Sequence, residues 1–190
     1  MTTFEETNIW LKTLGADNVD TKNTAQLERL RSAYRTFWER AIVLSREIQR
    51  DVPNLTLHDE SHFSALWSRA DQIAGPSLTL SPLEVFVLGG AILLHDNANS
   101  LAAFDGGLAA LKTTPEWKDA LAEWANKNDS PIDESLLSPE ASSSILFEVL
   151  RGLHAERAQT LAGLSFEVGG NTFRLIEDDQ LRTHVGEIMG

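Results

Sequence analysis

The residues of this chain best suited to chemistry are its histidines and one aspartate beside them. The histidines are His58, His62, His95, His154 and His184. His95 and Asp96 follow directly on the apolar run 85–94, and burying an imidazole and a carboxylate at the end of such a helix is costly unless a partner satisfies them. A divalent metal ion is one such partner, because neutral imidazole and carboxylate can be neighbouring ligands. The alternative is a helix C-cap, with Asp96 in the following turn.

Two further histidines are expected on the inner faces of helices. His62 begins a helix whose predicted buried stripe consists of Leu66, Ala70 and Ile73. The stripe that contains His154 consists of Leu146, Leu150, Leu153 and Leu161. Each histidine alone is more often a hydrogen-bonded core residue than a ligand. Three imidazoles on three helices, together with Asp96, predict a metal centre inside a helical bundle.

Composition limits the classes of partner. The chain has 190 residues, 42% of them hydrophobic, and a net charge of −12 with only 16 lysines and arginines. Nucleic acid is therefore an unlikely partner, because phosphate backbones are bound by clustered basic residues. The chain has no cysteine, which excludes disulfides and thiolate ligands. No apolar run is long enough to span a bilayer and no signal pattern begins the chain, so we expect the cytoplasm.

Hydrophobic periodicity and capping residues predict an all-α chain with one small β-hairpin near 164–176. Three helix starts place a hydroxyl N-cap before a proline, at Ser81-Pro82, Thr114-Pro115 and Ser138-Pro139, where the missing N–H of proline costs nothing. The expected helices span 4–14, 62–73, 82–94, 115–127 and 139–161, and a last one begins near 178. A further long helix, whose apolar stripe runs through 27–48, is expected to be capped at Asn23 and ended by Asp51-Val52-Pro53.

The organisation expected from these elements is one main domain. Residues 1–52 should form N-terminal helices that pack on the core, and residues 53–190 the metal-binding domain. A helical insertion is expected near 100–131, either as a lid or as peripheral packing. The last helix stops at Gly190 in the middle of its apolar pattern, which predicts that the chain continues and that Val185, Ile188 and Met189 form an exposed apolar face; the alternative is a frayed terminus.

The order His … His-Asp … His, with Leu93-Leu-His-Asp96 closing an apolar helix, resembles the HD superfamily of metal-dependent phosphohydrolases. His62 matches the first histidine of that pattern, because Leu66 and Ala70 follow it four and eight positions on. The local sequence resembles that of HD domains joined to a gyrase/histidine-kinase-type (GHKL) ATPase. The segments that carry this similarity are Leu57-His-Asp-Glu-Ser-His62, Leu88-Gly-Gly-Ala-Ile-Leu-Leu-His-Asp96 and Leu153-His-Ala-Glu-Arg-Ala158.

The resemblance implies a role for each residue. His62, His95 and Asp96 would be metal ligands, and Asp96 would also accept a proton in catalysis. His154 would bind a second metal or the substrate phosphate, and Arg157 would contact phosphate oxygens or form a salt bridge. His58 would contact the substrate, orient a metal ligand or cap its helix. A closing Asp is expected beyond Gly190, His184 is not expected to be a ligand, and Asn97-Ala98 replaces the usual Ile-Gly.

Two functions are compatible with these residues. The first is a phosphohydrolase that uses a divalent ion (Mn²⁺, Fe²⁺, Mg²⁺ or Ni²⁺) to act on a nucleotide or another phosphorylated small molecule. The second is a catalytically weak or inactive regulatory or scaffolding domain, coupled to a C-terminal ATPase module, to another partner protein or to copies of itself. Metal analysis together with a hydrolysis screen would discriminate between them.

Overall fold

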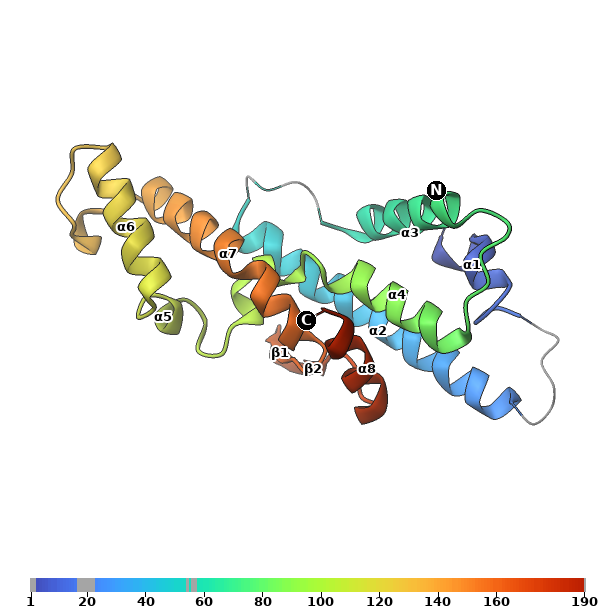
Figure 1. Ribbon diagram of the computed structural model, residues 1–190. Coiled ribbons are helices and arrows are strands. Elements are labelled where there is room, and N and C mark those ends of the chain that lie inside the picture. The colour runs from blue at the N-terminus through green and yellow to red at the C-terminus, as the bar shows by residue number, and fades with distance from the viewer. Residues whose placement is uncertain (1–2, 17–22, 54, 56–57, 190) are drawn as a thin grey trace.

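A computed structural model describes residues 3–16, 23–53, 55 and 58–189 (Figure 1); Leu57 and Gly190, which two of the predictions include, lie outside the described residues. The described residues form an all-α bundle with one two-stranded hairpin, as predicted. The helices are η1 (Phe4–Glu6), α1 (Asn8–Leu11), α2 (Thr24–Asp51), α3 (Glu60–Ala74), α4 (Pro82–Leu94), η2 (Asn97–Asn99), η3 (Leu101–Ala103), α5 (Gly107–Leu111), α6 (Pro115–Lys127), η4 (Glu134–Leu136), α7 (Pro139–Leu161) and α8 (Asp179–Met189); the strands are β1 (Ser165–Val168) and β2 (Asn171–Arg174).

The hydroxyl-proline signals mark the starts of three helices. The bounds of α4, α6 and α7 are those expected from the sequence. At each start the N-cap hydroxyl accepts a hydrogen bond from a backbone N–H three residues on, at 3.3 Å for Ser81, 3.2 Å for Thr114 and 3.2 Å for Ser138. These caps satisfy donors that the helix itself leaves unpaired.

The central core forms where α2, α3 and α4 meet, and it is rich in aromatic rings. Tyr34 of α2 is fully buried and packs edge-on against Trp67 of α3 and Phe86 of α4. Trp67 Nε1 donates a hydrogen bond to the Tyr34 hydroxyl at 2.8 Å. A Cβ added at Gly89 would lie 2.3 Å from that hydroxyl oxygen, so glycine is what allows α4 to approach α2. Because α2 shares this core with α3 and α4, the domain division at residue 52 stays a prediction.

The buried face of α3 differs from the predicted stripe. Ile73 is 86% exposed, whereas Phe63 and Trp67 are fully buried. The helix is rotated by about one residue, because the larger apolar rings of Phe63 and Trp67 fill the core and Trp67 finds the Tyr34 hydroxyl there. His62 is consequently at the border of the buried face and is only partly buried.

An arm extends from the bundle beyond the end of α4 (Figure 1). It consists of α5, α6 and the N-terminal half of α7, and a second hydrophobic cluster that includes Trp117 and Ile145 holds it together. The arm occupies the place of the predicted insertion near 100–131. Helix α7 connects the two regions, because its other half packs on η2, directly after His95 and Asp96.

The C-terminal hairpin and α8 complete the bundle, and α8 packs on α4. Strands β1 and β2 pair antiparallel, with Phe166 opposite Phe173. The expectation of an exposed Val185 was wrong: its side chain is fully buried, and it contacts α4 at Gly90. Ile188 is 64% exposed, and the side chain of Met189 is outside the described part. Among the described residues, no helix combines the length and the apolar character needed to cross a lipid bilayer.

Candidate metal centre

Helix α4 fixes the position of the His95-Asp96 pair. Its start is a capping box, in which the Ser81 hydroxyl and the Glu84 carboxylate each accept a hydrogen bond from the other residue's backbone N–H. Its middle is held against α2 at Gly89. The helix therefore ends at a defined depth, where His95 and Asp96 leave the apolar core between α3 and η2.

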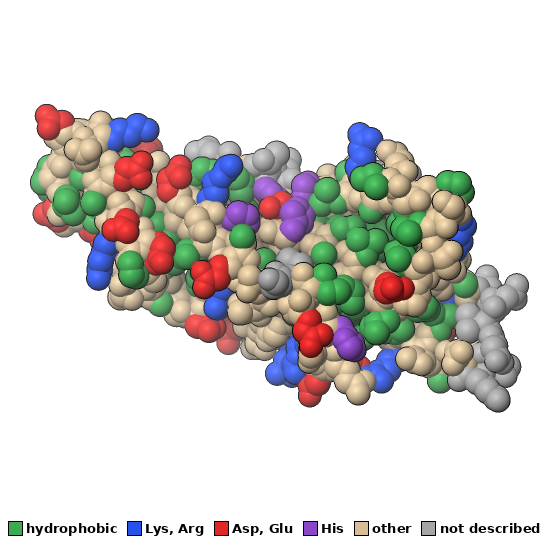
Figure 2. All heavy atoms as spheres, in the orientation of Figure 1, with side chains coloured by type: hydrophobic (Ala, Val, Ile, Leu, Met, Phe, Trp, Pro, Cys, Tyr) green, Lys and Arg blue, Asp and Glu red, His purple; other side chains and the backbone are tan. Residues whose placement is uncertain are grey.

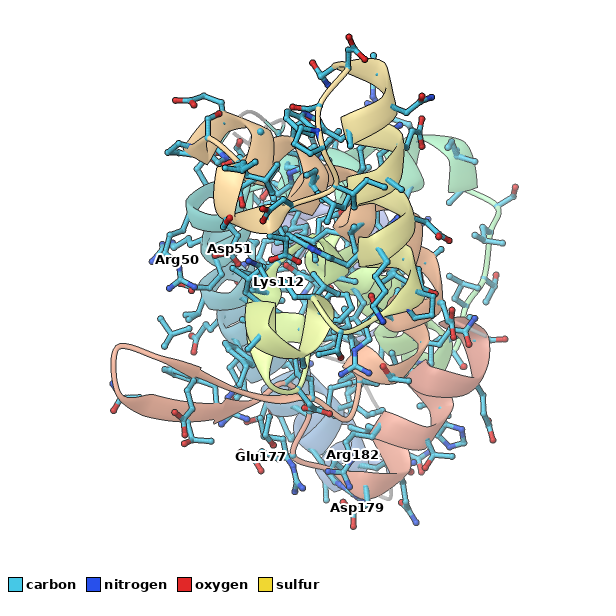
Figure 3. The ribbon with its side chains drawn as sticks, turned by 90° about the vertical axis from the view of Figure 1, so that its left-hand side faces the viewer. Arg50, Asp51, Lys112, Glu177, Asp179 and Arg182 are labelled. Atoms are coloured by element: carbon cyan, nitrogen blue, oxygen red, sulfur yellow. The ribbon has the colours of Figure 1, made fainter. Side chains whose placement is uncertain are left out.

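The turn after α4 is anchored to α2 as well. Asp51 near the end of α2 accepts a hydrogen bond from the backbone N–H of Leu101 through Oδ2, at 2.7 Å. Figure 3 shows Arg50 and Asp51 together at this end of α2, on the side from which the arm begins. The loop that carries the site is thus tied to two helices, which keeps its side chains in place.

Asp59 positions the other two histidines. As the N-cap of α3 its carboxylate accepts hydrogen bonds from the backbone N–H groups of Ser61, at 2.9 Å, and His62, at 3.2 Å. The Ser61 side chain and these backbone donors keep the pKa of Asp59 below its ordinary value against the effect of burial. His58 directly precedes the cap and His62 lies in the first turn, so the cap brings both rings to one side of the helix start.

Three imidazoles surround one carboxylate oxygen. The Nε2 atoms of the histidines lie 2.7 Å (His95), 3.2 Å (His58) and 3.5 Å (His62) from Asp96 Oδ2. The rings of His62 and His95 are stacked with their centroids 5.6 Å apart. Figure 2 shows purple histidine side chains gathered around a red acidic side chain on this face.

Some ring nitrogens of this cluster have a lone pair that no hydrogen-bond donor satisfies. His95 Nδ1 lies 2.8 Å from the carbonyl oxygen of Ile92, so it must carry a proton, and in a neutral ring Nε2 then presents a lone pair to the carboxylate. His62 Nε2 and His58 Nδ1 are buried and have no hydrogen-bond partner. Two acceptors that face each other repel unless a proton or a cation lies between them.

The pKa shifts express the same electrostatic arrangement. Burial lowers the pKa of His62, and the neighbouring His58 and His95 lower it further, so the charged form of this ring is disfavoured. Burial opposes charge on His95 as well, but the hydrogen bond and the charge of Asp96 outweigh it and raise the pKa of His95. Burial would raise the pKa of Asp96, but hydrogen bonds from His58 and His95 hold it far below its ordinary value.

The donor atoms fit a single divalent ion. One ligand atom each from His58, His62 and Asp96 lies within 4.8 Å of the other two. Two tetrahedral ligands at typical metal distances are roughly 3.3 Å apart, close to the separations of His58 and His62 from Asp96. The unpartnered Nε2 of His62 is the buried polar atom that such an ion would satisfy.

Comparison with known proteins identifies the family. The profile of the HD-CE family matches residues 52–190, which is most of the chain. The chain belongs to the HD-CE family. No curated protein and no solved structure is significantly similar to it. The HD-CE match contains all the residues of the cluster described above, from His58 to Asp96.

The structure brings together the three predicted ligands of this HD-CE chain and adds one residue. His62 and His95 both lie near Asp96 Oδ2. The group whose ligand atoms all lie close enough to share one ion consists of His58, His62 and Asp96, so the assignment of His95 as a ligand stays a prediction. His58, which sequence reasoning placed beside the substrate, is as close to Asp96 as the other two histidines are, and its side chain is only 8% exposed. The signal that could have identified it is the N-cap Asp59, which lies between two histidines four positions apart.

The other predicted residues lie on α7 and α8. His154 Nδ1 is 2.5 Å from the carbonyl oxygen of Arg151, and the assignment of His154 to a second metal or to phosphate stays a prediction. His184 is exposed, and its nearest acidic partner is Glu187, at 3.9 Å. The structure therefore gives no contact of His184 with the cluster.

Arg157 is occupied by contacts within the chain. Its Nε donates to the carbonyl oxygen of Ala103 at 2.7 Å, its guanidinium lies over the Phe104 ring, and one of its terminal nitrogens is 3.6 Å from an Asp105 oxygen. It lines a cavity of about 350 Å³ that also contains Asp105, Glu116 and Glu156. These carboxylates weaken the attraction of Arg157 for phosphate, and its phosphate contact stays a prediction.

Proposed function

We propose that this HD-CE chain is a divalent-metal-dependent phosphohydrolase that acts on a nucleotide or another phosphate ester. The observation that carries the proposal is the position of three imidazole Nε2 atoms within 3.5 Å of one oxygen of Asp96. Such a group is costly to bury without a cation. With one, it becomes a set of nitrogen and oxygen donors.

The donor set favours a particular class of ion. Imidazole nitrogens suit first-row transition metals, whereas Mg²⁺ prefers an octahedral shell of oxygens. We therefore propose Mn²⁺, Fe²⁺ or Ni²⁺ ahead of Mg²⁺ among the ions expected from the sequence. When bound, the ion would lower the pKa of a water molecule and neutralise the phosphoryl oxygens.

The side chains divide the remaining work. His58, His62 and His95 would hold the ion through Nε2, and the bond from His95 Nδ1 to Ile92 fixes the ring that presents this atom. Because its pKa is strongly lowered, Asp96 stays ionised. It is thus better suited to hold the ion and to orient a water molecule than to retain a proton. His154 remains our candidate for a second metal or for contact with the substrate phosphate.

A hydrolysis screen tests this proposal. The chain would be incubated with phosphomonoesters, phosphodiesters and nucleotides in the presence of Mn²⁺, Fe²⁺, Ni²⁺ or Mg²⁺ while phosphate release is measured. We expect turnover of at least one ester with a transition metal and its loss in His62→Ala. Turnover that is independent of added metal and insensitive to His62→Ala would contradict the proposal.

The contacts of Arg157 favour a second candidate function. A guanidinium engaged by Ala103 and Asp105 cannot readily bind phosphate, which suits a regulatory domain that binds a metal without turning over an ester. In that case we propose that the domain is joined to a GHKL-type ATPase and transmits the metal-bound state to it. Tight metal binding with no hydrolysis of any ester would support this candidate over the first.

A further inference from the structure

Asn97, the residue after the His-Asp pair, is fully buried at the end of α4. Its side-chain Nδ2 donates to the carbonyl oxygen of Leu93 at 2.5 Å and lies 3.4 Å from the carbonyl oxygen of Ala41 on α2. Because both partners are acceptors, the amide nitrogen must face them. One side chain therefore links the end of α4, the site turn and α2.

Asn97 satisfies one of the free carbonyls at the end of α4. The last carbonyls of a helix have no partner within it. Here the backbone N–H of His95 bonds to Ala91, the His95 ring bonds to Ile92, and the Asn97 amide bonds to Leu93. A candidate ligand and Asn97 thus cap successive carbonyls, and Asp96 lies between these two fixed side chains.

Stability alone does not explain an asparagine at this position. Its Oδ1 is buried and has no hydrogen-bond partner, and an unpaired buried acceptor costs about 1–3 kcal/mol. That cost is comparable to the gain from its donor bonds, so an apolar side chain of the same size would serve the core as well. What the apolar side chain would lack is the directional hold on the turn.

We propose that Asn97 is a positioning residue that fixes the Asp96 carboxylate relative to the three histidines. The inference rests on the metal-binding part of the proposed function. Asn99 supports the same turn from the other side, because its Nδ2 donates to the Asp96 carbonyl oxygen at 3.0 Å. The Asn97 amide thus fixes the residue that follows Asp96, and Asn99 bonds to the Asp96 carbonyl itself. Together they keep the carboxylate in the direction that the ligand set requires.

A pair of substitutions that differ by one hydroxyl tests the hydrogen bond itself. Asn97→Ala removes the donor, whereas Asn97→Ser leaves a hydroxyl that can donate to the carbonyl four residues earlier, which is Leu93. We expect Co²⁺ affinity to fall by about 10–100-fold in the Ala variant, as is typical when a residue that orients ligands is lost. The Ser variant should recover most of this loss, and the visible Co²⁺ spectrum should change in Ala and not in Ser.

Tyr34→Phe is the control for general destabilisation. It removes the hydrogen bond from Trp67 in the aromatic core, so it should lower the free energy of unfolding and leave Co²⁺ affinity and the spectrum unchanged. If the Ala variant does not fold, the side-chain amide signal of Asn97 in the wild-type chain replaces it. That NMR signal should shift when Co²⁺ or Zn²⁺ is added.

Each outcome decides the inference. Equal affinity in wild type, Ala and Ser would overturn it, and so would an equal loss in Ala and Ser, because volume rather than the hydrogen bond would then matter. An amide signal that does not respond to metal would also overturn it. Absence of Co²⁺ binding by the wild-type chain would instead overturn the proposed function, and this inference with it.

Discussion

The middle of α4 and its C-terminal end both bury polar groups, and they satisfy them differently. At Gly89 the neighbouring Tyr34 hydroxyl is paired with Trp67 inside the aromatic core. At the end of the same helix, His58 and His62 each keep a buried ring nitrogen without a partner. Buried polar groups in native proteins are normally paired. The comparison indicates that the middle of α4 pairs its polar group within the core, whereas its end leaves His62 Nε2 open to a ligand.

The largest expected effect is on metal binding at the end of α4. Asp96→Ala removes the oxygen that all three imidazoles face, so we expect the affinity for Co²⁺ or Mn²⁺ to fall by at least about 100-fold. Equilibrium dialysis measures this loss. Asp105→Ala, at an exposed carboxylate, is the matched control and should bind like the wild type. Helical circular dichroism should persist in both variants, because the apolar core holds the bundle together.

A substitution in the middle of α4 should instead lower the free energy of unfolding. In Gly89→Ala the new Cβ would lie 2.3–2.5 Å from three atoms of the Tyr34 ring and hydroxyl, and such overpacking costs about 3 kcal/mol. Chemical denaturation measures the loss. Gly152→Ala is the matched control, because this glycine of α7 has open space around its Cβ position. It should gain about 0.5–1 kcal/mol from helix propensity. Equal stability of the two variants would refute the close packing of α4 on α2.

A smaller effect is expected for the buried hydroxyl. Tyr34→Phe leaves the Trp67 N–H without its acceptor, at a cost of about 1–2 kcal/mol. Burial raises the pKa of Tyr34 well above its ordinary value, so the unfolded chain loses this proton at a lower pH than the folded chain. Stability should therefore fall as pH rises above about 10. The difference in unfolding free energy between wild type and Tyr34→Phe should shrink over that range; a constant difference would contradict it.

The pH dependence of metal binding is the mildest test of the comparison. Asp96 raises the pKa of His95, so this ring keeps its proton to a higher pH than a free imidazole would, and a bound ion must displace that proton. Affinity should therefore increase as pH rises from about 6 to 8. Calorimetry in buffers of different ionisation enthalpy should detect proton release. Binding with no proton release at pH 6 would exclude His95 from the ligand set.

The sequence predicted most of the fold because its helix starts are local signals. Ser81-Pro82 and the equivalent pairs act within one turn, and the structure has the expected bounds for those helices. The prediction of the buried face of α3 was wrong because two overlapping apolar stripes compete there. Only the partner across the core, Tyr34, selects the one with Trp67. The predicted exposure of Val185 was wrong for a related reason. The sequence of the last helix does not indicate that Val185 packs against Gly90 of α4.

The candidate site was predicted in part for a similar reason. His62, His95 and Asp96 could be found because they lie at the ends of apolar helices, where a polar residue is conspicuous. His58 lies before its helix, in a segment with no periodicity, so its distance from Asp96 depends on the path of a loop. The positioning role that we propose for Asn97 depends on the carbonyls of Leu93 and Ala41, which no sequence pattern brings together.

X-ray absorption at the edge of a metal bound to the chain tests the central claim most directly. With Co²⁺ or Zn²⁺ added, we expect the scattering pattern of about three imidazole rings together with oxygen ligands at about 2.0–2.2 Å. His58→Ala should remove one imidazole from this pattern. A shell made only of oxygen atoms would contradict the claim that His58, His62, His95 and Asp96 form a metal centre.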